Sequence, residues 1–217
     1  MISVVLPVRN GAAQLGEAIE SAATAGAEEV VVVDGGSRDG SAEIARGFKF
    51  VRLLEQRGPE LPDAYNEGIS AAQGDHLAFL GHDDLYVEGA LLALRDQLGT
   101  AAVVFGRLRH ELLGERPPPG FRAELLGGPR PALQLEAMLA TRQAVDAVGP
   151  LRYQTAHDVD WLARLSESDL EVRRTDVFVA RKRMREQSQG NRDTLREPER
   201  LVQILRDSIE RRRSGPR

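Results

Sequence analysis

Over its first hundred residues the chain alternates short runs of β-branched and other apolar residues with segments of helical periodicity. This alternation limits the fold more than any other feature of the sequence. The apolar runs predict strands at 2–8, 29–34, 49–54, 76–81 and 101–106. The periodic segments predict helices at 12–25, 41–46, 64–72 and 87–97. Strands and helices in this order predict an α/β fold with a mostly parallel sheet flanked by helices.

The second half of the chain is less regular. Strands are predicted at 107–113, 171–174 and 177–180, and helices at 141–148, 157–165 and 197–213. The prolines of 116–120 predict an irregular loop, because proline has no N–H to donate. With 217 residues, of which 41% are hydrophobic, the chain can bury one substantial core, so we expect one domain with appendages.

The composition excludes several classes of protein. A formal net charge of −4 argues against a nucleic-acid binder, which needs a surplus of basic residues. Without cysteine the chain forms neither a disulfide framework nor a thiolate metal site, which fits a reducing cytoplasmic setting. The apolar runs are far shorter than the roughly 20 residues of a membrane-spanning helix. Because Met1 leads directly into the first predicted strand, we also expect no signal peptide.

Polar clusters follow three of the predicted strands, at 7–11, 34–40 and 81–84. In an open parallel sheet, ligands bind beyond the carboxyl ends of the strands. Asp34 follows four valines, so its carboxylate can accept hydrogen bonds from a base or a ribose, with space for close approach at Gly35 and Gly36. The same loop can instead be a simple turn in which Ser37 or Asp39 caps the next helix.

Two further acidic clusters have the chemistry of a site. Asp83 and Asp84 follow an apolar run, and adjacent carboxylates at a strand end suit Mg²⁺ or Mn²⁺. The alternative is that Asp84 only caps the following helix. Asp158 and Asp160 fall at a predicted helix start, where the helix dipole keeps carboxylates ionised and one of them can act as a general base. The alternative is that Asp158 caps this helix and Trp161 belongs to the core.

In their order and spacing, these clusters resemble the motifs of the family 2 glycosyltransferases, which have the GT-A fold. The resemblance runs from Ile2 to about Asn191, and the similar stretches are 3–10, 31–41, 63–69 and 74–80. It implies a nucleoside diphosphate sugar donor of the UDP, GDP or dTDP type. It also implies inverting transfer to a hydroxyl of a glycan or lipid-linked acceptor, with no nucleic-acid partner.

The resemblance also assigns the residues. Asp158 is the base that deprotonates the acceptor, and Asp83 and Asp84 hold Mg²⁺ or Mn²⁺. The domain divides into a donor-binding half at 1–106, an acceptor and catalytic half at 107–192, and a C-terminal helix with a basic tail at 193–217. The nucleotide-binding residues are Pro7, Asn10, Asp34, Gly36, Asp39, Asp63 and Asn66.

The chain departs from the family's pattern at three places. Gly81 stands where the metal motif usually begins with an acidic or amide residue, and His157 stands where the acidic pair usually opens with Glu. The late motif of processive members is missing, and 184–188 stands near its place, which favours an enzyme of single transfers. Two alternatives remain open: a catalytically impaired nucleotide-binding relative with a regulatory role, and a nucleotidyltransferase.

The predicted C-terminal helix is amphipathic. It places Leu201, Ile204, Leu205 and Ile209 along one face and ends in three arginines at 211–213. Such a helix can dock on the domain, form a homodimer seam, or bring its arginines to an anionic lipid surface at the inner face of the plasma membrane.

Overall fold

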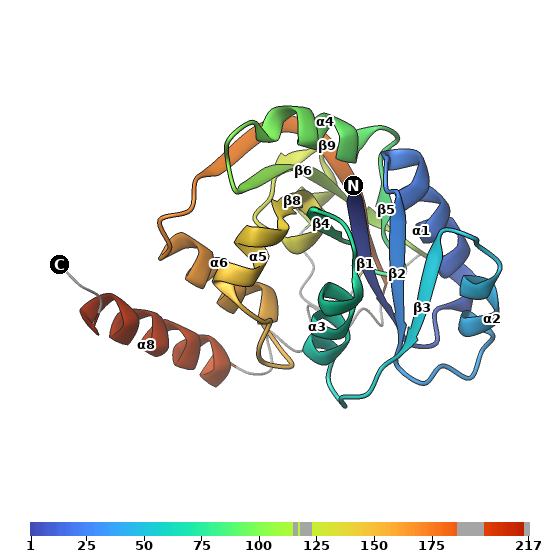
Figure 1. Cartoon of the computed structure of the whole chain (residues 1–217), viewed down its shortest axis with the longest axis horizontal. Helices are drawn as coiled ribbons and strands as arrows, with labels where there is room; N and C mark the ends of the chain where they lie inside the picture. Colours follow the sequence, from blue (N-terminus) through green and yellow to red (C-terminus); the bar gives the residue numbers. More distant parts are fainter. Residues whose placement is uncertain (115–116, 118–122, 186–197, 215–217) are drawn as a thin grey trace.

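The computed structural model describes residues 1–114, 117, 123–185 and 198–214 (Figure 1). Within these ranges, nine strands form one mixed, mostly parallel sheet in the order β3-β2-β1-β4-β8-β6-β9-β5, with β7 paired to β6. The strands are β1 (Ile2–Val8), β2 (Glu29–Asp34), β3 (Val51–Glu55), β4 (His76–Phe79), β5 (Leu85–Tyr86), β6 (Val103–Leu112), β7 (Arg130–Pro131), β8 (Met138–Thr141) and β9 (Val172–Met184).

The helices pack on the two faces of the sheet and at its edge. Short 3₁₀ helices, η1 (Ala123–Leu126) and η2 (Leu135–Ala137), precede β7 and β8. The α-helices are α1 (Ala12–Ala25), α2 (Ser41–Arg46), α3 (Leu61–Ala71), α4 (Ala90–Leu98), α5 (Arg142–Val148), α6 (His157–Ser166) and α8 (Pro198–Ser214).

The central strands are buried on both faces, which explains their uninterrupted apolar runs. Side chains alternate between the two faces of a strand. Val4 and Leu6 therefore join a core built with α1 and α4, whereas Val5 joins a second core built with α3, α5 and α6. Trp161 of α6 lies in this second core and donates from Nε1 to the carbonyl oxygen of Gly149 at 3.0 Å.

Strand β8 sets the direction of the strands around it. It lies between β4 and β6 and is antiparallel to both, so β6 runs in the same direction as β4. Strand β9 is parallel to β6, and β1 to β4 are parallel to one another. The carboxyl ends of β1, β2, β4, β6 and β9 therefore all lie at one edge of the sheet.

The α/β prediction is confirmed, and strands 2–8 and 29–34 and helices 12–25 and 41–46 are found with the predicted bounds. The prediction of separate strands at 101–106 and 107–113 was wrong, because β6 continues through a register shift at Gly106. The strands predicted at 171–174 and 177–180 are likewise one strand, β9. Strands β5, β7 and β8 were not predicted. Most of the loop predicted at 116–120 lies outside the described residues.

Among the described residues, no helix is long and apolar enough to cross a membrane.

Gly106 provides a test of this packing. A Cβ at this position would stand 2.4 Å from Cγ2 of Val179 and 2.5 Å from the carbonyl oxygen of Val177. We predict that Gly106→Ala lowers the free energy of unfolding by about 1–3 kcal/mol through overpacking, measured by urea denaturation. The control is Gly16→Ala in α1, where the nearest atom is 3.8 Å away and a gain in helix propensity is expected. Equal stabilities of the two variants would contradict the close packing of β6 on β9.

Candidate functional site

The candidate site lies at the sheet edge where β1, β2 and β4 end. Val8 of β1 is the register partner of Asp34 of β2, and Val5 is the partner of Phe79 of β4. The loops that follow these three strands therefore leave the sheet side by side. This is the edge at which open α/β sheets bind their ligands.

Asn10 and Asp34 hold the first two of these loops together. The N–H of Asn10 donates to Ser37 Oγ at 2.9 Å, and Asn10 Oδ1 accepts from the N–H of Arg38 at 2.9 Å. Asp34 is buried and accepts from both the N–H of Ser37, at 3.2 Å, and its hydroxyl. Gly36 has a φ of 77° and open space where a Cβ would stand. The carboxylate thus shapes the loop, and Gly36 leaves room beside it. Pro7, in β1, is buried just below.

Asp39 accepts hydrogen bonds at the starts of both α1 and α2, so the contact with the next helix that the sequence suggested is found together with a second one. Its Oδ2 accepts from the N–H of Ala12 at 2.9 Å, and its Oδ1 accepts from the Ser41 hydroxyl at 2.6 Å. These two hydrogen bonds, the Ser41 one first, lower the pKa of the Asp39 carboxyl below its usual value. Helix α2 has Gly40 as its N-cap, and the N–H of its first residue, Ser41, donates to Asp39 Oδ1 at 3.2 Å. Asp39 therefore places an ionised carboxylate at the surface of the predicted nucleotide loop.

Asp63 and Asn66 both belong to α3 and make structural contacts. Asp63 Oδ2 accepts from the N–H of Glu60 at 2.9 Å, which completes a capping box. The side-chain amide of Asn66 donates to the carbonyl oxygen of Leu151 and accepts from its N–H, both at 2.9 Å. Asn66 thus joins the first half of the domain to the segment that leads into α6.

The adjacent carboxylates of Asp83 and Asp84 have different surroundings. Asp83 keeps 19% of its side chain exposed, and its Oδ2 accepts from Arg185 Nη2 at 2.8 Å. His82 Nε2 lies 3.4 Å from the same nitrogen. The His82 ring packs on Gly11, and burial lowers the pKa of this ring, which favours its neutral form. Asp83 therefore faces the loops of the candidate site.

Asp84 is buried and pairs with β9. Its Oδ1 accepts from the N–H of Arg183 at 2.8 Å, and its Oδ2 lies 3.6 Å from Lys182 Nζ. Lys182 also pairs with Glu136 of η2. Burial raises the pKa of Asp84 above its usual range, and the charge of Lys182 opposes that rise. Asp84 does not cap α4, which begins at Ala90 with Gly89 as its N-cap.

The two carboxylates leave no space for a side chain at position 81. A Cβ on Gly81 would stand 2.9 Å from Asp84 Oδ2 and 3.3 Å from Asp83 Oδ1. An acidic residue at 81 would place a third carboxylate against these two. In this geometry an acidic side chain at position 81 would therefore meet both steric and electrostatic repulsion.

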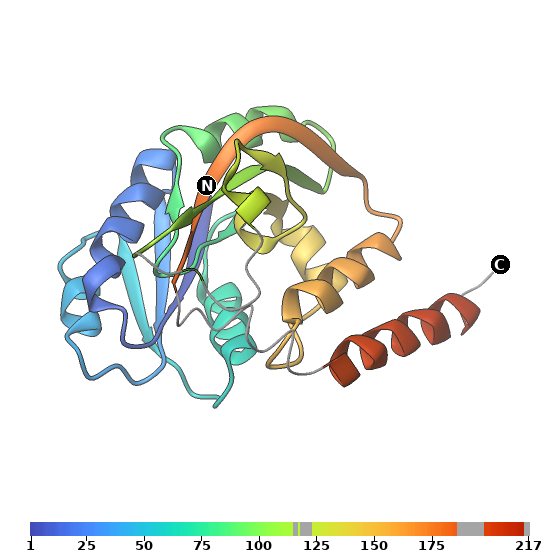
Figure 2. The same ribbon diagram turned by 180° about the vertical axis from the view of Figure 1, so that it is seen from behind.

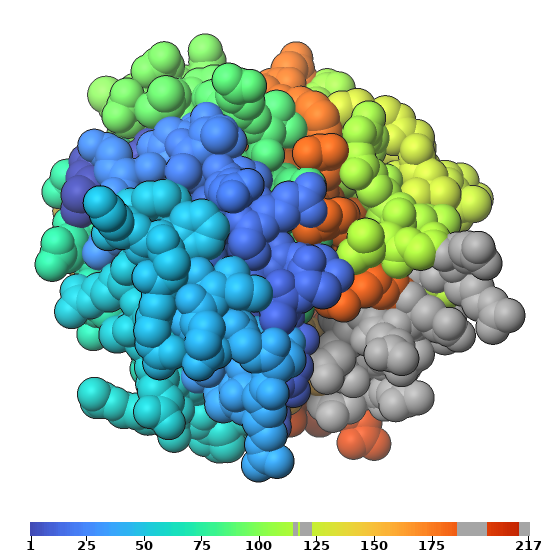
Figure 3. All heavy atoms as spheres, turned by 90° about the vertical axis from the view of Figure 1, so that its right-hand side faces the viewer, coloured from blue at the N-terminus to red at the C-terminus, as the bar shows by residue number. Residues whose placement is uncertain are grey.

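Arg183 fastens the end of β9 to the start of the chain. Its Nη1 lies 2.6 Å from Glu17 Oε2 of α1, and its Nε donates to the carbonyl oxygen of Asp83. Figure 3 shows β9 in orange directly beside the blue N-terminal segment. The end of β9 therefore borders the loop that carries Asp83.

Asp158 and Asp160 also differ in their surroundings. Asp158 lies in the first turn of α6 and is partly exposed, and its Oδ1 accepts from the N–H of Val159 at 2.8 Å. The N-cap is Ala156, so Asp158 does not occupy the cap position. Asp160 is fully buried and pairs with Arg152 at 2.7 Å and Arg164 at 2.9 Å. Asp158 is thus the aspartate of this pair with a carboxylate near solvent.

Tyr65 lies between α6 and the charged cluster of Asp84, Lys182 and Glu136. Its ring centroid is 5.5 Å from that of His157, and burial also lowers the pKa of His157. The pKa of the Tyr65 phenol is raised, first by burial and then by nearby carboxylates that include Asp84 and Asp158. The start of α6 therefore shares one buried neighbourhood with the loop that follows β4.

A divalent metal would find few ligands here. The described part of the chain contains no group of three or more His, Asp or Glu side chains arranged to hold a metal ion. Asp84 pairs with Lys182 and Arg183, whereas Oδ1 of Asp83 accepts no hydrogen bond from a described residue. One carboxylate together with substrate phosphates is a common Mg²⁺ site. The residues present therefore fit a metal held by Asp83 and a bound diphosphate.

Sequence reasoning did not identify the basic residues and Glu136 as part of this neighbourhood. Lys182, Arg183 and Arg185 all come from the carboxyl end of β9 and contact Asp83 or Asp84. The signal in the sequence was the dense basic run at 181–185. This run reaches the site because β9 is one long strand, which the sequence alone did not predict.

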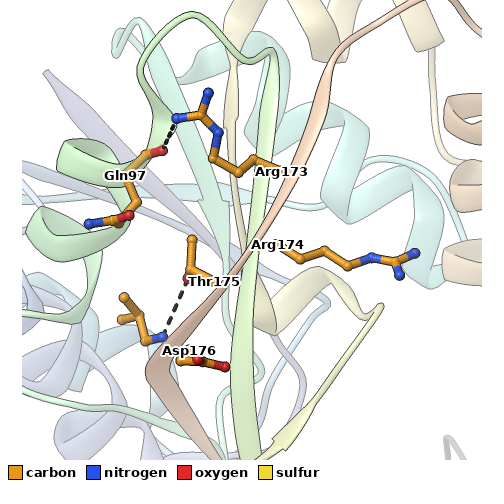
Figure 4. Close-up of a pocket in the computed structure, with 6 residues that line it drawn as sticks. Gln97, Arg173, Arg174, Thr175 and Asp176 are labelled. Carbon is orange, nitrogen blue, oxygen red and sulfur yellow. Dashed lines mark hydrogen bonds between the residues drawn. The ribbon is translucent and has the colours of Figure 1, made fainter.

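An open depression lies elsewhere on the molecule, along the amino-terminal half of β9 (Figure 4). Its volume is about 530 Å³, and Arg173 donates to the carbonyl oxygen of Gln97 at 2.9 Å across it. None of the predicted site residues lines this depression, which is formed by Gln97, Arg173, Arg174, Thr175, Asp176 and Val177.

Comparisons with known proteins show the family and the fold of the chain. The family model described as "Glycosyl transferase family 2" matches residues 3–151. A PGL/p-HBAD biosynthesis glycosyltransferase of Mycobacterium bovis is 40% identical over 100 residues, which cover 43% of this chain and 39% of that protein. An uncharacterised glycosyltransferase of Rickettsia typhi is 36% identical over 90 residues, which cover 40% of this chain and 28% of that protein. The match thus spans well under half of the length of either relative.

The fold is similar to crystal structures of S. aureus TarS. One of them superimposes with a TM-score of 0.72 at 15% identity, over 95% of this chain and 64% of that one. A second, of TarS in complex with UDP-GlcNAc, has a TM-score of 0.67 at 16% identity, over 86% of this chain and 59% of that one. At this level of identity the similarity establishes the GT-A fold alone.

The ion pairs of Asp160 with Arg152 and Arg164 should contribute to the stability of the protein. Asp160→Asn removes the charge that offsets two guanidinium groups, of which Arg164 is mostly buried. We expect the free energy of unfolding to fall by about 3 kcal/mol in urea denaturation. The control, Asp146→Asn on the exposed surface of α5, should change it by less than about 0.5 kcal/mol. A loss no larger than that of the control would show that Asp160 does not anchor α6.

Proposed function

The chain belongs to glycosyl transferase family 2, and we propose that it transfers a sugar from a nucleoside diphosphate sugar to an acceptor hydroxyl, with inversion and with a divalent metal. The observation that carries this proposal is the meeting of the β1, β2 and β4 loops at one sheet edge, with Asp34 and Asp83 inside the family-matched residues 3–151. Asp158 lies in the first turn of α6, a few residues beyond that match.

In this proposal the nucleoside binds at the β1 and β2 loops. Asp34 has lone pairs beyond those used by Ser37 and can accept from a base or a ribose. The open space at Gly36 allows close approach. The donor is of the UDP, GDP or dTDP type. Because a TarS crystal structure contains UDP-GlcNAc, UDP sugars are the first donors to test.

Asp83 is the proposed protein ligand of Mg²⁺ or Mn²⁺. The metal, when bound, supplies positive charge that stabilises the leaving diphosphate. Arg185, 2.8 Å from Asp83, brings a permanent positive charge to the same place. The guanidinium can pair with phosphate oxygens and so orient the diphosphate. Asp84 keeps the loop in place through its contacts with β9.

Asp158 is the proposed base. In the first turn of α6 the helix dipole favours its ionised form, which can accept the proton of an acceptor hydroxyl. Burial lowers the pKa of the neighbouring His157, so this ring is favoured as neutral and adds no cation that would weaken the base. The acceptor in this proposal is a glycan or a lipid-linked molecule.

One observation favours a second candidate function. Gly81 and His157 both replace residues that the family's active members usually carry. A protein that binds the nucleotide without turnover would keep the Asp34 loop and lose transfer. Binding of UDP in calorimetry, together with no release of UDP from UDP sugars across a panel of acceptors, would support this reading against the transferase.

The base is tested by Asp158→Asn. Because the amide cannot take up the acceptor proton, we expect transfer to fall by about 10²- to 10⁴-fold while the Kd of the donor stays the same. Transfer is measured as nucleotide release and donor binding by calorimetry. Asp146→Asn is the matched control and should keep full activity. Unchanged transfer in the Asp158 variant would exclude this residue as the base.

If Asp83 is the metal ligand, substitution of the two adjacent aspartates should affect different properties, metal-dependent binding for Asp83 and stability for Asp84. In the wild type we expect Mn²⁺ to lower the Kd of UDP. In Asp83→Asn this effect of Mn²⁺ should be at least about tenfold smaller, because the amide lacks the negative charge that hard cations prefer. Asp84→Asn should mainly lower the melting temperature, because it breaks contacts with Lys182 and Arg183. UDP binding that is insensitive to EDTA in the wild type would argue against the metal.

A further inference from the structure

Helix α8 presents two different faces, and only one of them is packed on the protein. Figures 1 and 2 show α8 at the outer edge of the molecule beside α6, apart from the sheet. Along an α-helix, residues three, four and seven positions apart share a face. The sequence of α8 supplies apolar residues for both faces.

The packed face fixes α8 to the domain. Ile204 is 2% exposed, and the Ser208 hydroxyl donates to Glu167 just beyond α6. Arg211 Nε lies 2.6 Å from Glu167 Oε2. Nearer the start of α8, the Tyr153 hydroxyl donates to Asp207 Oδ2 at 2.8 Å. Of the roles considered for this helix, docking is therefore observed.

The other face carries an exposed apolar stripe. Val202, Leu205 and Ile209 are 45%, 62% and 49% exposed, and their spacing places them on one side of the helix. Docking on α6 leaves all three uncovered. Large aliphatic side chains gathered on an exposed helix face mark an interaction surface.

One arginine flanks this stripe on each side, and the exposed Glu199 and Glu210 lie beyond one of them, Arg206. At 3.6 residues per turn, position 206 lies beyond Val202 on one side, and position 212 lies beyond Leu205 on the other. Arg206 is exposed, and Arg212 keeps 66% of its side chain exposed although its Nε lies 3.8 Å from Glu167 Oε1. An apolar stripe between basic residues is the arrangement of helices that lie in the interface of an anionic bilayer, where arginines reach the headgroups.

The same arrangement fits a second copy of the chain less well. A stable dimer buries at least roughly 1,200 Å², of which three aliphatic side chains supply only a small part. A lipid surface needs no matching apolar stripe and offers the opposite charge.

We propose that the face of α8 formed by Val202, Leu205, Ile209, Arg206 and Arg212 binds the surface of an anionic lipid bilayer. The helix lies in the plane of the interface, with its opposite face held on α6 through Ile204 and Glu167. The contact is peripheral and depends on salt, because part of its free energy comes from the arginines.

This surface bears on the proposed function. Arg200, in the first turns of α8, lies 4.9 Å over the ring of Tyr153, in the segment that leads into α6 and Asp158. If the proposed transfer holds, a bilayer at α8 brings a lipid-linked acceptor to the side of the molecule that carries the proposed base. Binding of vesicles, however, requires neither donor nor acceptor, so this inference is tested separately.

The experiment is cosedimentation of the full chain with vesicles of phosphatidylcholine, with and without phosphatidylglycerol. We expect binding to the anionic vesicles only, weakened at least roughly tenfold by Leu205→Ser with Ile209→Ser. Arg206→Gln should weaken it about fivefold, and added salt should weaken it further. The matched control changes two exposed leucines elsewhere, Leu92→Ser with Leu133→Ser, and should bind as the wild type does.

Three results would overturn the proposal. One is equal binding of the wild type and the α8 stripe variant, with unchanged thermal unfolding showing that both are folded. Another is equal binding to neutral and anionic vesicles. The third is a concentration-dependent dimer in analytical ultracentrifugation that the stripe variant dissociates, which would assign this face to a second copy of the chain.

Discussion

Asp84 ties the carboxyl end of β9 to the loop that follows β4, and the positions of Asp83 and Arg185 in the candidate site follow from that contact. Its carboxylate is buried against the N–H of Arg183 and the ammonium of Lys182. Removing a buried carboxylate from such a cluster is costly, so the contact fixes the two segments relative to each other. As a result, Asp83 faces the β1 and β2 loops while Arg185 lies beside it.

Adjacent carboxylates with different roles are the main feature of this site. Burial and the partners from β9 make Asp84 a structural residue. Asp83 is partly exposed, and in the proposed function its second oxygen binds the cation. The same division recurs on α6, where Asp160 is buried between two arginines and Asp158 remains near solvent. In each pair, one aspartate fixes the backbone that positions the other.

Much of the fold could be predicted from the sequence, because β1, β2 and the helices between them have a clear periodicity and are buried by their near neighbours. The long strands β6 and β9 were misjudged. Gly106 and the polar pair at 175–176 looked like breaks, whereas tertiary pairing carries both strands through them. The positions of Asp34 and Asp83 at strand ends were foreseen. The contacts of Asp84 with Lys182, and of Asp39 with Ala12, depend on segments far apart in the chain, so spacing alone could not reveal them.

In the proposed function the donor binds at the carboxyl ends of β1, β2 and β4. A crystal structure of the full chain with UDP and Mn²⁺ tests it most directly. We expect the nucleoside against the Asp34 loop and the diphosphate beside Asp83 and Arg185, with the metal held by Asp83 and phosphate oxygens. Nucleotide bound elsewhere, such as in the depression between Gln97 and Arg173, or a diphosphate remote from Asp83, would contradict it.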